Sequence, residues 1–236
     1  MKLGANFIES FNYTKLLFKD LKQLIMLMIL SVIPVVNFVF LGYLGNIMKQ
    51  SKEAKELPKI DNYVELGIQG LKMGIVSIVY MIIPLCIIMS GYDIFGIFRF
   101  IDLRGTAATA VMLVGALIML VVSIVLAMAL VKMVKHDNNI NEAWAFGDIL
   151  EHVKKVGWIT CIVGVIAIAL TTGIISYILY ALAAKIGDGV MFSISGTVII
   201  ALLVSPFVGT FTARSATLTY LEGAPAQETS TPTEQT

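Results

Sequence analysis

Five long apolar stretches, separated by short polar segments, dominate the hydrophobic pattern of this chain. None of them contains Asp, Glu, Lys, Arg or His, and they cover residues 23–48, 73–92, 105–131, 156–184 and 189–213. A helix needs roughly 20 apolar residues to cross a hydrocarbon core that is ~30 Å thick. Every stretch reaches that length, so the pattern predicts an all-α fold, a polytopic helical membrane bundle.

The first stretch is divided by Pro34 into residues 24–33 and 35–48. Because a helix rises ~1.5 Å per residue, neither half crosses the full core by itself. Two arrangements are open: one tilted span with a proline kink, or a re-entrant hairpin that turns near Pro34 and Asn37. In the hairpin, Asn37 is expected to cap the turn or to bridge the two helices.

The distribution of Lys and Arg tests these two arrangements, because both residues concentrate in the cytoplasmic segments of membrane proteins. If the first stretch turns back, segments 1–22, 49–66 and 132–155 share one side and carry 12 Lys/Arg, against three on the other. If it crosses, the bias disappears. We therefore expect a re-entrant hairpin and four full spans in a multi-pass protein of the cell membrane, with both termini cytoplasmic.

The polar segments next to the spans have their own helical signals. Aromatic residues and lysines mix in residues 1–22, as in a helix that lies among lipid headgroups. In the linker 49–66, Pro58 ends one segment and Asp61 is placed to cap a helix that runs into the second apolar stretch. Residues 136–155 predict a loop followed by an amphipathic helix.

Composition narrows the class of protein further. The chain is 58% hydrophobic and 14% charged, with a net charge of +1, so no basic surface indicates a nucleic-acid partner. Residues 1–221 are expected to form a single membrane domain, and residues 222–236 a disordered polar tail. Cys86 and Cys161 lie inside apolar stretches, which predicts neither a disulfide nor a metal site.

Motifs for catalysis are not found in the sequence. It contains no phosphate-binding G-x-x-x-x-G-K-[ST], no zinc-protease H-E-x-x-H and no G-x-S-x-G. Asp148 and His152 have a metal-compatible spacing, but this spacing is common on the polar face of a helix and no cysteine joins them. We predict no catalytic residue, no metal and no cofactor.

Two ionisable residues close to membrane depth are candidate sites by default. Lys72 precedes the second stretch and Arg214 follows the last one, and we interpret both as side chains that snorkel to the interface. The alternative for Arg214 is a fixed charge that faces a polar seam. Gly209, Ala213 and Thr217 recur every four residues beside it, which predicts a helix-packing seam.

A charged cluster follows the second stretch, outside the predicted cytoplasmic side. It consists of Asp93, Arg99, Asp102 and Arg104. Two acids and two bases could pair in a partly dry gate, but we favour an ordinary charged loop in the headgroup zone.

A weak internal repeat relates residues 12–34 to residues 62–84 at an offset of 50. Among the coinciding residues are the two prolines, Pro34 and Pro84. Each unit would consist of an interfacial helix, a lysine and an apolar stretch. Biased composition alone also produces some of these matches, so both explanations are open.

Several motifs together resemble a known family. They are the aromatic start FNYTKLLFKDLKQ, the split stretch VIPVVNFVFLGYLGNIMK, the linker KELPKIDNYVELGIQGLK and the helix AFGDILEHVKK. The chain thereby resembles an uncharacterised prokaryotic membrane family, domain of unknown function 4013, which is common in archaea. The resemblance covers roughly residues 5–220 and implies a fold and a membrane context, but no activity.

Three functions are consistent with the sequence. We favour a non-enzymatic scaffold, assembly factor or accessory subunit, whose partners are the lipid bilayer and either a second copy or another membrane protein. The split first stretch and the Thr- and Ser-containing last stretch also fit an oligomeric transporter or channel for a small solute. A membrane enzyme acting on lipid is the third hypothesis.

Overall fold

The computed structural model describes residues 2–92, 106–186 and 190–224. Over these residues the chain is helical and contains no strand, which confirms the predicted all-α class. Its elements are α1 (Lys2–Thr14), η1 (Lys15–Lys19), α2 (Leu21–Val32), α3 (Asn37–Lys49), α4 (Tyr63–Tyr92), α5 (Thr106–Lys135), η2 (Ile140–Trp144), α6 (Phe146–Val156), α7 (Trp158–Ile186) and α8 (Val190–Gly223). Helix α8 therefore continues two residues beyond the boundary expected between domain and tail.

The first apolar stretch folds back on itself as a helical hairpin, as the charge pattern predicted. Pro34 lies in the break between α2 and α3. The side-chain amide of Gln23 donates to the Tyr43 hydroxyl at 3.1 Å, whereas a continuous helix would hold these residues ~30 Å apart. Asn37 bridges the turn, because its side-chain amide donates to the Ser31 carbonyl at 2.6 Å.

Helix α4 begins with a reciprocal cap that corrects one prediction. The Glu65 backbone N–H donates to the Asn62 side chain at 3.2 Å, and the Asn62 amide donates back to the Glu65 carboxylate at 3.1 Å. The cap is therefore Asn62, not Asp61, and it satisfies an N–H that the first turn leaves without a partner. The helix then runs without interruption into the second apolar stretch, as expected.

The two units of the proposed repeat have different structures. Residues 12–34 are divided among α1, η1 and α2, while residues 62–84 belong almost entirely to one helix. Pro34 lies in a break, but Pro84 lies inside α4. The sequence matches at an offset of 50 therefore do not correspond to a structural repeat.

Helices α3 and α4 pack with their backbones in contact, because glycines face each other across the interface. A Cβ added to Gly70 would lie 1.7 Å from the Phe38 carbonyl oxygen, and one added to Gly42 would lie 1.9 Å from the Leu66 carbonyl oxygen. Only glycine permits this approach. The buried Gln69 side chain strengthens the contact by donating to the Gly42 carbonyl at 3.0 Å.

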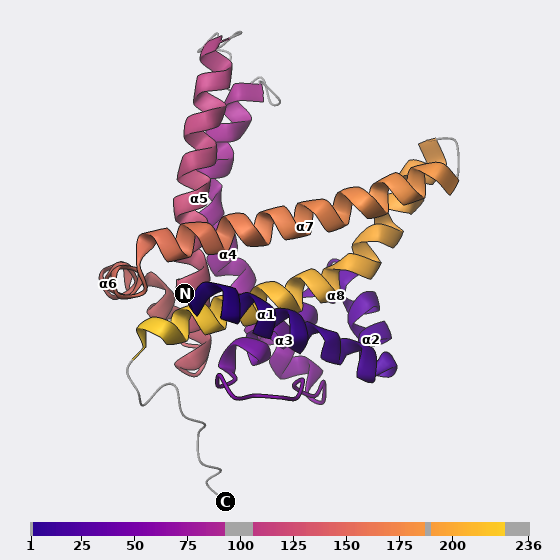
Figure 1. The fold of residues 1–236 in the computed structure, drawn as a ribbon, viewed down its shortest axis with the longest axis horizontal. Helices are drawn as coiled ribbons and strands as arrows, with labels where there is room; N and C mark the ends of the chain where they lie inside the picture. The colour runs from indigo at the N-terminus through magenta and orange to yellow at the C-terminus, as the bar shows by residue number, and fades with distance from the viewer. Residues whose placement is uncertain (1, 93–105, 187–189, 225–236) are drawn as a thin grey trace, which may run out of the picture.

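Two long helical hairpins, α4–α5 and α7–α8, project from a common base and point in different directions (Figure 1). We call them the two arms. Among the described residues, three helices are long and apolar enough to cross a membrane: Tyr63–Ser90, Thr109–Lys135 and Trp158–Ile178. The three spans agree with three of the four predicted crossings, those in α4, α5 and α7. The fourth, residues 189–213, lies partly outside what the structure describes and stays a prediction. The arms nevertheless diverge, whereas the spans of a compact bundle would lie side by side.

The base collects segments that are far apart in the sequence: α1, the linker between α3 and α4, η2, α6 and the C-terminal part of α8. Three hydrogen bonds illustrate this convergence: Asn6 to Glu222 at 2.9 Å, Lys72 to the Asn138 carbonyl at 3.0 Å, and His152 with the Tyr220 carbonyl at 2.8 Å. The segments that the charge count assigned to one side of the membrane therefore lie together in space.

The predicted amphipathic helix is α6, which buries Ile149 and Val153 against the base. Its polar side carries Asp148, whose carboxylate accepts a hydrogen bond from Lys132 at 2.9 Å. This bond lowers the pKa of the Asp148 carboxyl. Gly157 joins α6 to α7 with a φ of +100°, a conformation that side chains other than glycine rarely adopt.

A buried arginine and an apolar cavity at the base

Arg214 lies at the centre of the base and is only 1% exposed. Its guanidinium donates to the Ser51 carbonyl at 2.9 Å, to the Lys52 carbonyl at 2.6 Å and to the Glu9 carboxylate at 2.8 Å. The snorkelling interpretation was therefore wrong, because the side chain points into the protein rather than out to the interface. The structure instead agrees with the alternative, a fixed charge on a polar seam.

The contacts of Arg214 explain how a charge is tolerated there. An ion removed from water is expensive to bury unless its hydrogen bonds and its charge are both satisfied. Glu9 supplies the opposite charge from α1, and two linker carbonyls accept further bonds. The guanidinium Nε is buried without a hydrogen-bond partner among the described residues, so the satisfaction is not complete. The Tyr13 ring covers the guanidinium at 4.7 Å, a cation–π contact. One arginine thus joins α1, the linker and α8.

Tyr13 extends this junction toward the linker. Its hydroxyl donates to the side chain of Gln50. Burial raises the pKa of Tyr13 to about 12, against an opposing effect of the nearby Arg214 charge. The phenol therefore keeps its proton and acts as a hydrogen-bond donor to Gln50.

Helix α1 has the reverse of the usual arrangement of a surface helix. Its buried face is polar at helical spacing and includes Asn6, Ser10 and Thr14. Its outer face exposes large apolar side chains, Ile8 by 65% and Phe11 by 55%. A helix with a polar inner face and an apolar outer face is suited to hydrocarbon or headgroups rather than to water.

The helix-packing seam of the last stretch lies at the contact with α3. A Cβ added to Gly209 would lie 2.8 Å from the Phe40 ring, so the two helices approach closely there. Ala213 and Thr217 are fully buried on the same face. Lys72 does not snorkel freely either, because its ammonium group bonds the Asn138 carbonyl in the turn after α5.

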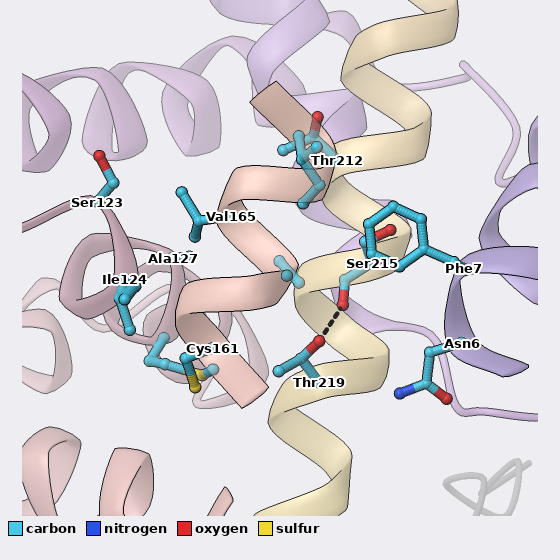
Figure 2. A pocket seen from close by; sticks show the side chains of 14 residues that line it. Asn6, Phe7, Ser123, Ile124, Ala127, Cys161, Val165, Thr212, Ser215 and Thr219 are labelled. Atoms are coloured by element: carbon cyan, nitrogen blue, oxygen red, sulfur yellow. Dashed lines mark hydrogen bonds between the residues drawn. The ribbon is translucent and has the colours of Figure 1, made fainter. Parts of the chain in front are cut away.

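Helices α1, α5, α7 and α8 line a partly open apolar cavity of about 170 Å³ beside this junction (Figure 2). Its walls include Phe7 from α1, Ile124 from α5, Val165 from α7 and Ser215 from α8. No local sequence pattern predicts this cavity, because it depends on how four helices meet.

The other residues predicted as sites do not belong to this junction or to the cavity. Asp93, Arg99, Asp102 and Arg104 lie outside the residues that the structure describes. Asp148 is bonded to Lys132, and His152 stacks on Tyr220, so the pair faces different partners. In the described parts of the chain, no group of His, Cys, Asp and Glu is arranged to hold a metal ion.

The glycine contact between α3 and α4 was also overlooked, although the sequence carries a signal for it. Gly70 and Gly74 form a G-x-x-x-G motif, which brings helices into close contact in membranes. Gly70 also belongs to the motif KELPKIDNYVELGIQGLK, which predicts a capped helix but not this contact. The motif was visible in the sequence, but its partner on α3 was not.

The apolar arms, the inverted α1 and the buried charge together define a helical membrane protein. Within this class, the family described as "Protein of unknown function (DUF4013)" matches residues 26–184, more than half of the 236 residues. The chain belongs to this family, as the resemblance in its motifs indicated. Comparison with curated proteins and with solved structures returned no match.

Proposed function

We propose that this protein is a non-enzymatic accessory or scaffold subunit of a membrane complex, and that α7 is the helix that binds the partner. The partner would be a transmembrane helix of another protein. Within the described residues, the most apolar 18-residue window of α7 is only 6% buried, compared with 28% in α4 and 22% in α5. This difference is the observation that carries the proposal.

Gly173 supports a protein partner rather than lipid alone. Glycine destabilises a helix by ~1 kcal/mol relative to alanine, so its presence in the middle of a helix needs a reason. At Gly42 and Gly70 the reason is a neighbouring backbone, but around Gly173 an added Cβ would meet no atom within 4 Å. A helix from outside the chain would supply the missing neighbour.

The proposed placement in the membrane follows from the base. We place the base at the cytoplasmic face of the cell membrane, because its segments hold most of the Lys and Arg. The α2–α3 hairpin would enter the membrane from that side without crossing. The break between α2 and α3 is not covered by the described residues, since Ile33 is 45% and Val35 80% exposed, so its open backbone groups need headgroups, water or a partner.

The test compares Gly173→Leu with Gly147→Leu in protein extracted from its own membrane in a mild detergent. Gly147 is a matched control, because an added side chain there also meets no atom within 4 Å, but the residue lies in α6 at the base. Native mass spectrometry should show a stoichiometric foreign protein with the wild type and with Gly147→Leu, and its loss with Gly173→Leu.

Two outcomes would contradict this proposal. A complex that survives Gly173→Leu would exclude α7 as the binding helix. A homo-oligomer without any foreign protein would replace the accessory role with self-association and would make flux of a small solute into liposomes the next assay.

The two other functions have weaker support. A solute path needs polar groups along it, but the cavity is lined mainly by carbon atoms. The hydroxyls of Ser123 and Thr219 are bonded within their own helices, and the unpartnered Ser215 hydroxyl alone makes no path. For a lipid enzyme, Asp148 and His152 would have to act together, and each is engaged by a different neighbour.

A further inference from the structure

We propose that the cavity between α1, α5, α7 and α8 binds a hydrocarbon chain of a membrane lipid. This site is separate from the proposed contact of α7 with a partner. It depends on the membrane position of α5 and α7, and not on the accessory role.

The size and shape of the cavity suit an apolar chain. Its volume of about 170 Å³ is similar to that of an engineered protein cavity, ~150 Å³, which remains free of water and binds benzene. It therefore has room for a segment of a chain rather than for a whole lipid. Phe7, Val165 and Ile168 supply apolar walls, and Gly164 leaves one side open.

The hydroxyl groups in the wall do not make the cavity polar. Ser123 donates to the Met119 carbonyl at 2.7 Å, and Thr219 donates to the Ser215 carbonyl at 2.8 Å (Figure 2). Both bonds lie within a single helix and use the only proton that each hydroxyl can donate. The Asn6 amide is similarly directed to Glu222. The Ser215 hydroxyl has no hydrogen-bond partner among the described residues, so it is the polar exception in this wall. A polar ligand would still find few donors here, whereas a hydrocarbon needs none.

The surroundings identify the occupant. Helices α5 and α7 are candidate spans, and α7 exposes Val163 and Ile166 next to the cavity residues Gly164 and Val165. In a bilayer the abundant molecule at such a surface is lipid. An empty cavity would lose the dispersion contacts of its walls, and a lipid chain restores them without requiring any hydrogen bond.

The chain offers a well-matched pair of variants. Gly164 lines the cavity and Gly173 does not, although both lie in α7 and an added Cβ meets no atom within 4 Å at either position. Gly164→Leu would fill the cavity, while Gly173→Leu has the same effect on helix propensity and leaves the cavity open. Ala127→Leu fills the cavity from α5 and serves as a second, independent variant.

The experiment uses the purified full chain in phosphatidylcholine vesicles that contain a phosphatidylcholine with a diazirine at the end of one acyl chain. After illumination, peptide mapping locates the cross-links. We expect enrichment on cavity residues of α5, α7 and α8, and a decrease of roughly tenfold in Gly164→Leu and Ala127→Leu, equivalent to ~1.4 kcal/mol of binding. Gly173→Leu should retain the wild-type pattern.

Cross-links spread evenly over the exposed faces of α5 and α7, or unaffected by both filling variants, would overturn the proposal. Thermal unfolding in detergent shows whether each variant is folded. If either filling variant is folded and keeps its cross-links, the cavity does not hold the chain. Because the vesicles contain no partner protein, this result is independent of the test of the accessory role, in which Gly173→Leu is the variant expected to fail.

Discussion

The base and the two arms are built on different physical principles. The base joins distant segments through directed polar contacts, above all those of Arg214 with α1 and the linker. The arms are pairs of apolar helices whose outer faces remain exposed, with Leu117 on α5 exposed by 65%. The base is therefore held together by contacts within one chain, while much of the apolar surface of the arms has no neighbour in that chain.

The base and the arms therefore depend on different interactions for their stability. Hydrogen bonds and ion pairs in the base can be lost only with a penalty, because the buried partners have no water to replace them. Exposed apolar residues on the outside of the arms have few neighbours within the chain, so exchanging one for another should change the free energy of unfolding little. Each of the following predictions compares a change at a contact of the base, or at the contact between α3 and α4, with a control.

The largest effect is expected from Arg214→Leu. This change removes three hydrogen bonds to a charged group and leaves buried linker carbonyls unsatisfied, so it should lower the free energy of unfolding by about 3 kcal/mol or more. Leu117→Ala on the arm should cost less than ~0.5 kcal/mol in the same detergent. Thermal unfolding in one detergent measures both, and equal losses would abolish the distinction between base and arms.

An intermediate effect is expected at the contact between α3 and α4. Gly70→Ala places a methyl group against the Phe38 carbonyl and should destabilise the protein by roughly 1–3 kcal/mol. Gly67→Ala is the control on the same helix, where the nearest atom, on Val39, is 3.8 Å from the added Cβ. It should be neutral or stabilising by up to ~1 kcal/mol, because alanine favours the helix. If Gly67→Ala also destabilised the protein, any methyl group added along the α3–α4 interface would be harmful, and the close contact at Gly70 would not be special.

The smallest effect concerns the ion pair between Lys132 and Asp148. The hydrogen bond from Lys132 lowers the pKa of Asp148, so the folded state favours the carboxylate. Its contribution is present above the ordinary pKa of an aspartic acid, ~3.9, and is lost as the pH falls through the lowered value. Between about pH 5 and pH 3, wild type should lose slightly more stability than Asp148→Asn. The difference should be small because the Asp148 side chain is 73% exposed, and identical pH profiles would mean that the pair contributes nothing.

The sequence alone determined the features that depend on local pattern and composition. Uncharged stretches of sufficient length specified the helices, and Pro34 with the distribution of lysines specified the hairpin of α2 and α3. Amphipathic spacing specified α6. These features follow from periodicity, helix breaking and charge, which are properties of neighbouring residues.

Only the tertiary structure decided how the helices meet. Arg214 and Glu9 are 205 residues apart, and no pattern in either segment identifies the other as its partner. The cavity requires four helices, and Gly70 needed the α3 backbone to explain it. From the sequence alone, Arg214 could equally have snorkelled to the interface and Gly70 could have faced lipid. A hydrophobic pattern specifies which residues avoid water but not which surfaces pack together. Contacts between distant segments decide this.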